Sequence, residues 1–331
     1  MSAGYSMSFG LLTDALRSLR WLHGLWNRVL FAGAPATELG LHRVLFFAAL
    51  LLCSFVRYGD VVRWPELGGV LWSPTSFFRI LHLPLLSEGN LLAALWMWRL
   101  SLAFALVGLF TRTSALVATI LGFYIVGLPH NFGKINHNDA FVVIGLAVFA
   151  LSRCGAAWSM DSVLRPMRER SNAEAGWSGH YSWPLALCRL MLTLIPFAAG
   201  VAKLAGPGTA EWVLTDNLTH LLVAHHYTHY PPSHVGLLLA RYPWSGQMLA
   251  GSTIVIELLA PIAAFAPLRV RTAVAASLVA MLAGFWIMLG VLFAELITFL
   301  VIFFMPWREV GSWLVRPSAP AAGQASAGSR A

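Results

Sequence analysis

One lysine stands inside a long apolar stretch of this sequence, and its chemistry gives the first functional hypothesis. Residues 185–212 read LALCRLMLTLIPFAAGVAKLAGPGTAEW, and Lys203 lies near the end of that stretch. A charged ammonium is costly in hydrocarbon, so an intramembrane lysine indicates a functional site unless it lies at a helix end and reaches water. An ammonium withdrawn from water gives up its proton more readily. Lys203 is therefore our candidate general base.

The composition indicates an integral membrane protein. The 331 residues are 58% hydrophobic and 11% charged, whereas soluble domains have about 25% charged residues. Seven or eight apolar runs are long enough to cross a bilayer, which needs roughly 20 residues for each helix. No large soluble insert separates these runs, so we expect one all-α, polytopic bundle of transmembrane helices. The net charge of +8 fits arginines at helix ends that face the cytoplasm, with membrane lipid rather than nucleic acid as the partner.

The chain divides into three expected segments. Residues 1–40 mix leucine, tryptophan and arginine, as in an amphipathic helix at the membrane interface. Residues 41–307 form the membrane domain, and residues 308–331 are an Ala-, Gly- and Ser-rich tail that we expect to be disordered. The expected spans are 41–56, 91–110, 115–128, 140–151, 184–204 and 247–265, followed by 272–306 as two short spans broken near Gly290 or one kinked span.

The arginine distribution orients these spans. With the N-terminus inside, Arg112, the 153–183 loop and Arg269 all face the cytoplasm. The polar segments 130–139 and 205–245 then face outward, as does the end of the span that carries Lys203. We therefore expect the active face to be extracytoplasmic, in the inner membrane of a bacterium.

Several further residues are candidates for the site. The loop HNFGKINHND, residues 130–139, contains Asn136, His137 and Asp139. His137 could orient a substrate oxygen or share a proton, or it could simply bond to its loop neighbours. Glu257 lies inside a span, where it either pairs structurally or lines a polar cavity. The remaining cavity candidates are Arg43 and Trp212.

A histidine cluster follows the lysine-bearing span. His225 and His229 are one helical turn apart, so both rings can lie on one helix face. The segment can be a wet interfacial stretch, a substrate contact or a metal site, because imidazole is the commonest metal ligand. A single cluster is too little for a membrane di-iron centre, and we expect no metal. Motifs for nucleotide binding or serine nucleophiles are absent from the sequence.

Two stretches, 135–164 and 187–212, resemble the membrane domain of vitamin K-dependent gamma-glutamyl carboxylase and its bacterial relatives, the HTTM (horizontally transferred transmembrane domain) proteins. The similarity covers most of residues 40–306. The residues that carry it, in the expected order, are Arg43, Asn136, His137, Trp158, Ser159, Asp161, the run AGVAKL at 199–204, and Glu257.

The resemblance implies a chemistry for two of these residues. A lysine matching Lys203 deprotonates a reduced quinone of the vitamin K type, which then reacts with O2 and becomes an epoxide. The basic intermediate removes a proton from a glutamate side chain, and CO2 adds to it, a lyase-type carboxylation. A histidine matching His137 is expected near the quinone. Two departures from the family are expected. We expect no large lumenal domain like that of the animal enzyme, and no histidine follows His234 in the sequence, although relatives tend to carry one in the span after the glutamate.

The expected function is therefore a quinol-oxidising membrane enzyme with Lys203 as base, coupled to carboxylation or another modification of a secreted peptide. The alternative is a non-catalytic membrane factor for maturation or export of such a peptide.

Overall fold

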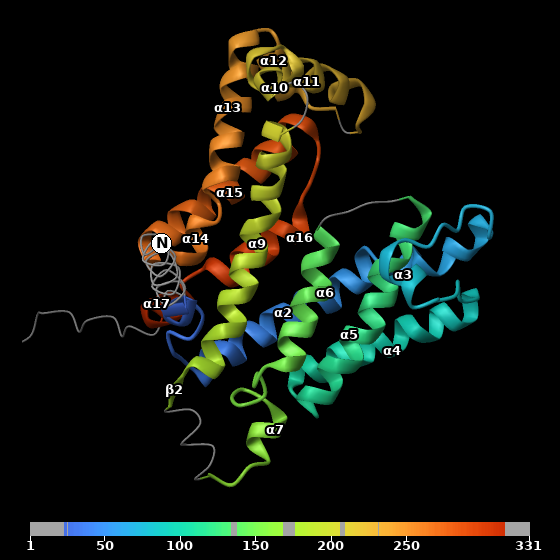
Figure 1. Ribbon diagram of the computed structural model, residues 1–331, viewed down its shortest axis with the longest axis vertical. Coiled ribbons are helices and arrows are strands. Elements are labelled where there is room, and N and C mark those ends of the chain that lie inside the picture. Colours follow the sequence, from blue (N-terminus) through green and yellow to red (C-terminus); the bar gives the residue numbers. More distant parts are fainter. Residues whose placement is uncertain are drawn as a thin grey trace, which may run out of the picture.

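The protein is almost entirely helical in its computed structural model (Figure 1), which confirms the all-α prediction. The structure describes residues 23, 24, 26–133, 138–167, 176–205, 209–230 and 232–314. Two two-residue strands, β1 (Ala34–Pro35) and β2 (Trp177–Ser178), pair antiparallel beside the start of the central helix. Most of the expected N-terminal amphipathic helix lies outside the described residues.

Six described helices are long and apolar enough to cross a membrane, and two shorter apolar helices accompany them. This agrees with the predicted polytopic bundle and makes the chain an integral membrane protein. The long helices are α2 (Ala36–Val56), α4 (Glu88–Val107), α5 (Thr111–Gly127, continued by the 3-10 helix η2, Leu128–Phe132), α9 (Gly179–Ala205), α13 (Pro243–Leu259, continued by α14, Ile262–Phe265) and α15 (Leu268–Leu289). The shorter ones are α6 (Asn138–Leu151) and α16 (Ala294–Phe304).

Gly290 separates α15 from α16, so residues 272–306 are broken near Gly290 into two helices and do not form one kinked helix. Its φ of +72° is a left-handed conformation, and its N–H caps α15 by donating to the carbonyl of Trp286. Glycine takes this conformation without steric cost.

Short helices connect or flank the spans. After α2 come the 3-10 helix η1 (Gly59–Leu67) and α3 (Ser76–Ile80), and α7 (Met160–Val163) follows α6. The segment after Lys203 folds as α10 (Thr209–Leu214), α11 (Asn217–Thr228) and α12 (His234–Ala240). Helix α17 (Trp307–Leu314) begins at the last residue of the expected membrane domain and continues into the expected tail. The indole of Trp307 donates to the carbonyl of Ile302 at 2.8 Å.

Helix α9 lies at the centre of the molecule (Figure 1) and packs against α2, α6 and α16 as well as α13 and α14. Next to it, phenylalanine rings from α2, α6 and α16 fill a common core. The ring of Phe46 stacks on Phe149 at a centroid distance of 4.8 Å. It also meets Phe299 at 5.6 Å. Since lipid tails are as apolar as these side chains, this close packing rather than escape from water holds the helices together.

A buried arginine fixes the end of the bundle where α4 turns into α5. Arg43, from α2, is fully buried and donates to the carbonyls of Cys154 (3.5 Å) and Trp158. Gly108 lies against it with a φ of +73°, and a Cβ at Gly108 would collide with Arg43 and Ser159. Arg43 therefore links α2 to the turn that follows α6.

Asp161 caps α5 at the same end. Its carboxylate accepts hydrogen bonds from the amides of Phe110 (2.9 Å) and Thr111 (2.7 Å) and from the Thr111 hydroxyl (2.7 Å). Burial alone would raise the pKa of Asp161, but these hydrogen bonds and the charge of Arg165 outweigh it and lower the pKa below the ordinary value. The amides at the start of α5 lack acceptors within the helix, and the Asp161 carboxylate supplies acceptors for two of them.

Replacing Gly108 with alanine tests the close approach of α4 to Arg43. Gly108→Ala should lower the free energy of unfolding by about 2–4 kcal/mol, from left-handed strain and overpacking together. Gly133→Ala is the control, because Gly133 also has positive φ (+84°) but open space around its Cβ position. It should cost only about 1–2 kcal/mol. Denaturant unfolding in detergent micelles measures both, and equal losses would contradict the packing role.

The cap on α5 predicts a pH dependence. Because folding lowers the pKa of Asp161, its ionised form stabilises the protein at pH values above the unfolded pKa of 3.8. That stabilisation is lost as the pH falls through the lower, folded-state pKa. Asp161→Asn should therefore unfold at lower temperature than the wild type at neutral pH. The difference should shrink below pH 3.8, and a gap that stays constant with pH would contradict the cap.

Candidate functional site

Lys203 and Glu257 form an ion pair between α9 and α13. The Lys203 ammonium nitrogen Nζ lies 2.6 Å from each carboxylate oxygen of Glu257. Only 4% of the Glu257 side chain and 20% of the Lys203 side chain are exposed. The two helices approach closely here, since a Cβ added at Gly200 would lie only 3.0 Å from the Cβ of Glu257. Glycine at this position permits the approach. Glu257 is thus structurally paired, one of the two alternatives left open by the sequence.

Trp212 joins this pair from α10. The ammonium nitrogen of Lys203 lies 5.7 Å from the centroid of the Trp212 ring, within the range of a cation–π contact. The indole N–H of Trp212 is buried and has no hydrogen-bond partner among the described residues. Three residues expected at the site, Lys203, Glu257 and Trp212, therefore converge. The indole N–H of Trp212 is a hydrogen-bond donor that none of the described residues uses.

His225 of α11 and His229, the residue that follows the end of α11, stack on each other with ring centroids 4.3 Å apart. Helix α11 packs against α13, the helix that carries Glu257. Within the described ranges, no group of three His, Cys, Asp or Glu side chains is arranged to hold a metal ion. The Nδ1 atom of His225 is buried without a partner in that part of the chain.

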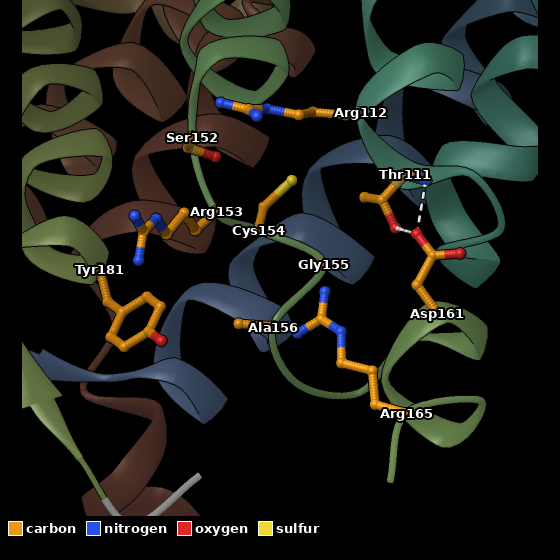
Figure 2. Close-up of a pocket in the computed structure, with 10 residues that line it drawn as sticks. All are labelled: Thr111, Arg112, Ser152, Arg153, Cys154, Gly155, Ala156, Asp161, Arg165 and Tyr181. Atoms are coloured by element: carbon orange, nitrogen blue, oxygen red, sulfur yellow. Dashed lines mark hydrogen bonds between the residues drawn. The ribbon is translucent and has the colours of Figure 1, made fainter. Parts of the chain in front are cut away.

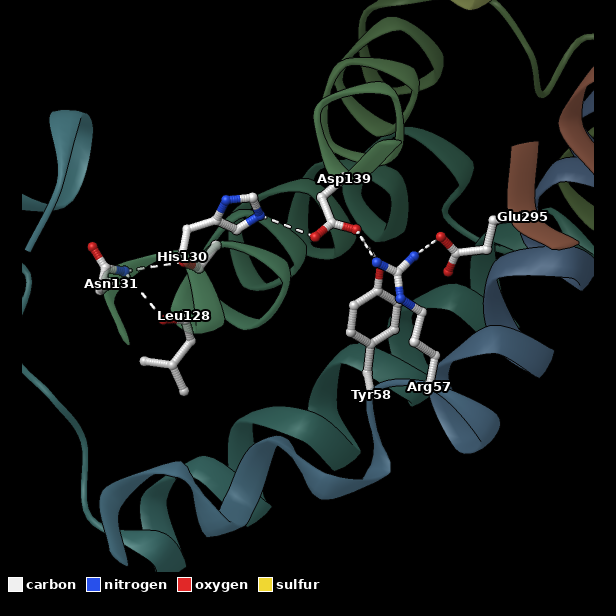
Figure 3. Close-up of polar contacts among 8 residues, drawn as sticks. Arg57, Tyr58, Leu128, His130, Asn131, Asp139 and Glu295 are labelled. Atoms are coloured by element: carbon white, nitrogen blue, oxygen red, sulfur yellow. Dashed lines mark hydrogen bonds and ion pairs between the residues drawn. The ribbon is translucent and has the colours of Figure 1, made fainter. Parts of the chain in front are cut away.

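Asp139 belongs to a second polar cluster (Figure 3). Its carboxylate accepts from Arg57 at 2.7 Å and from the hydroxyl of Tyr58 at 3.2 Å, and it lies 3.0 Å from His130 Nε2. Arg57 also pairs with Glu295 from α16. Burial, followed by the charge of Asp139, raises the pKa of Tyr58. The cluster therefore joins the end of α2 to α6 and α16.

A cavity of about 200 Å³ opens beside this cluster, with Trp64 among its lining residues. The sequence marked Asp139 as a site candidate but gave no partner for it. Arg57, Tyr58 and His130 were missed as functional candidates. The signal available in the sequence was an Arg-Tyr pair directly after an apolar run, together with a loop that contains an acidic residue.

Asn136 and His137 lie outside the described residues, so their expected place near Lys203 stays a prediction. The residues on either side of them are held in place. Asn131 is fully buried, and its side-chain oxygen accepts from the Thr75 amide at 2.8 Å. On the other side α6 begins at Asn138, and its second residue, Asp139, belongs to the polar cluster described above.

Arg43 lies elsewhere than expected. It was a substrate-cavity candidate, but its guanidinium is used by the carbonyls of Cys154 and Trp158 in the turn after α6. The physical reason is that this buried turn has carbonyls without helical partners, and a buried arginine needs such acceptors.

Comparisons of the chain with protein-family models, with curated proteins and with solved structures found no match.

A double-mutant cycle tests the Lys203–Glu257 pair. Lys203→Met should destabilise the protein by about 3–5 kcal/mol, because it leaves the buried Glu257 carboxylate without its counter-ion. Lys203→Met combined with Glu257→Met should cost clearly less than the two single changes together. Unfolding in detergent supplies the energies. Single costs that add to within about 0.5 kcal/mol would show that the two side chains do not interact.

Proposed function

We propose that this protein is a membrane enzyme that oxidises a lipid-soluble quinol, with the Lys203–Glu257 pair as the proton acceptor. The observation that carries the proposal is the 2.6 Å contact of Lys203 Nζ with both oxygens of a carboxylate that is 4% exposed. Such a pair is costly inside a membrane bundle, and charged groups there are a functional hypothesis by default.

The pair can accept a proton without adding net charge to the site. Transfer of one proton along the hydrogen bond converts the ammonium and carboxylate into a neutral amine and a carboxylic acid, which a low-dielectric environment tolerates better than separate charges. The amine then takes the proton of a quinol O–H. The products are an ammonium paired with a quinolate, next to the protonated Glu257, so the quinolate replaces Glu257 as counter-ion of Lys203.

Trp212 supports a bound aromatic substrate in two ways. Its ring lies beside the ammonium of Lys203, where a planar quinol ring can also pack. Its buried, unused indole N–H is a donor for a quinol oxygen. In this proposal His137, which matches the family's histidine, orients the same substrate.

The quinolate then reacts with O2, as the resemblance to the HTTM carboxylases implies. In the overall reaction one quinol and one O2 give one quinone epoxide and one water, so the quinol is oxidised and O2 is reduced. Coupling of this step to CO2 addition on a secreted peptide is the family's reaction. In this proposal the Lys203 end of α9 lies at the extracytoplasmic face of a bacterial inner membrane, the orientation that the arginine bias favours.

The test is O2 consumption and epoxide formation by the purified protein with a reduced naphthoquinone. Lys203→Arg is the sharpest variant, because an arginine keeps the charge pair with Glu257 but cannot be deprotonated. We expect Lys203→Arg and Lys203→Ala each to lose activity by about 100-fold or more, the contribution of a general base.

Two outcomes would contradict the proposal. Full turnover by a folded Lys203→Arg variant would exclude Lys203 as the base. A folded wild type that forms no epoxide would reject the enzyme, and a copurifying peptide would then support the maturation factor instead.

A further inference from the structure

A second cavity, of about 410 Å³, lies at the other end of α9 from Lys203 (Figure 2). Tyr181, one of its lining residues, is 22 positions before Lys203 on α9, about 33 Å along a helix. That distance matches the roughly 30 Å hydrocarbon thickness of a bilayer. The start of α5 and the residues that follow the end of α6 form the other walls, so the cavity lies where these membrane helices reach a surface.

The cavity carries an excess of positive charge. Arg112, Arg153 and Arg165 line it together with one carboxylate, that of Asp161. Figure 2 shows the three arginine side chains spread around the backbone of residues 152–156. The Asp161 carboxylate is used by three donors at the start of α5. No hydrogen bond or ion pair engages the three guanidinium groups within the described part of the chain.

Hydrogen bonds fix the backbone that forms the walls of this cavity. Arg43 binds the carbonyls of Cys154 and Trp158 from its fully buried position. Ser159 and Ser162 form a capping box at the start of α7, which carries Asp161. The arginines therefore project from a backbone that is fixed before any ligand arrives, which lowers the cost of binding.

We propose that this cavity binds a phosphate group. Guanidinium groups bind phosphate through paired, charge-assisted hydrogen bonds. Basic pockets between membrane helices suit anionic phospholipid headgroups. The volume also falls within the roughly 300–1,000 Å³ of small-ligand pockets. The phosphate belongs to a phospholipid headgroup or to a soluble phosphate compound, and the experiment separates these sources.

Arginines at helix ends also set membrane topology, and this role must be distinguished from binding. Topology depends on the number of positive charges near the spans, so lysine replaces arginine without loss. Bidentate phosphate binding depends on the guanidinium fork, which lysine lacks. The variant Arg112→Lys/Arg165→Lys therefore keeps charge and topology while removing the fork. Arg112→Gln/Arg165→Gln removes the charge as well.

Native mass spectrometry of the purified full chain measures the lipid arm, with phosphatidylglycerol and phosphatidylcholine offered together. The soluble arm measures the rise in unfolding temperature with inorganic phosphate. Arg79→Gln is the control, because Arg79 is exposed on α3, which packs near the opposite end of α5 through Phe78 and Tyr124.

We expect the wild type and Arg79→Gln to bind the phosphate probe equally. Binding should fall about tenfold or more in Arg112→Gln/Arg165→Gln, as the loss of charged hydrogen bonds implies. It should also weaken measurably in the double lysine variant. Selective retention of phosphatidylglycerol assigns a lipid headgroup, and stabilisation by inorganic phosphate alone assigns a soluble ligand. Binding of neither probe by the wild type, or equal binding by all variants, would overturn the proposal.

Discussion

The close ion pair between Lys203 and Glu257 is the constraint on which the functional end of this structure depends. It joins α9, the central helix, to α13, and α13 in turn packs against α10, α11 and α12. Neither charge is tolerable alone in a membrane bundle, so each fixes the position of the other. Because each charge needs the other, the contact is stable. The same pairing creates a site where a proton can move without changing the total charge.

The same requirement explains two further arginines within the spans, Arg99 of α4 and Arg189 of α9. Arg99 donates to the carbonyl of Ser54 at 2.8 Å and lies over the ring of Phe55. Arg189 donates to the carbonyl of Phe303 at 2.8 Å and faces Glu38 at 3.6 Å. Each charge thus has an acceptor or counter-ion on a neighbouring helix, as a medium without water demands. These links make a few polar residues decisive for how the apolar helices are arranged.

Much of this arrangement could be predicted from the sequence, and the reasons for the remainder are physical. The apolar runs predicted the spans, and Gly290 marked the break between α15 and α16, because both signals are local. Lys203 and Glu257 were recognised separately as costly charges. Their pairing was not predicted, since they are 54 residues apart and only the packing of α9 on α13 sets their relative height. Arg43 was misplaced for the same reason: its acceptors in the 154–158 turn are more than 100 residues away.

The most direct measurement is the infrared difference spectrum of the purified protein when a reduced naphthoquinone is added without oxygen. If the pair accepts the quinol proton, a protonated carboxyl band and a quinolate band appear together. The carboxyl band is absent from Glu257→Gln. A spectrum in which the quinol binds but stays protonated, and in which Glu257 stays ionised, would contradict the account.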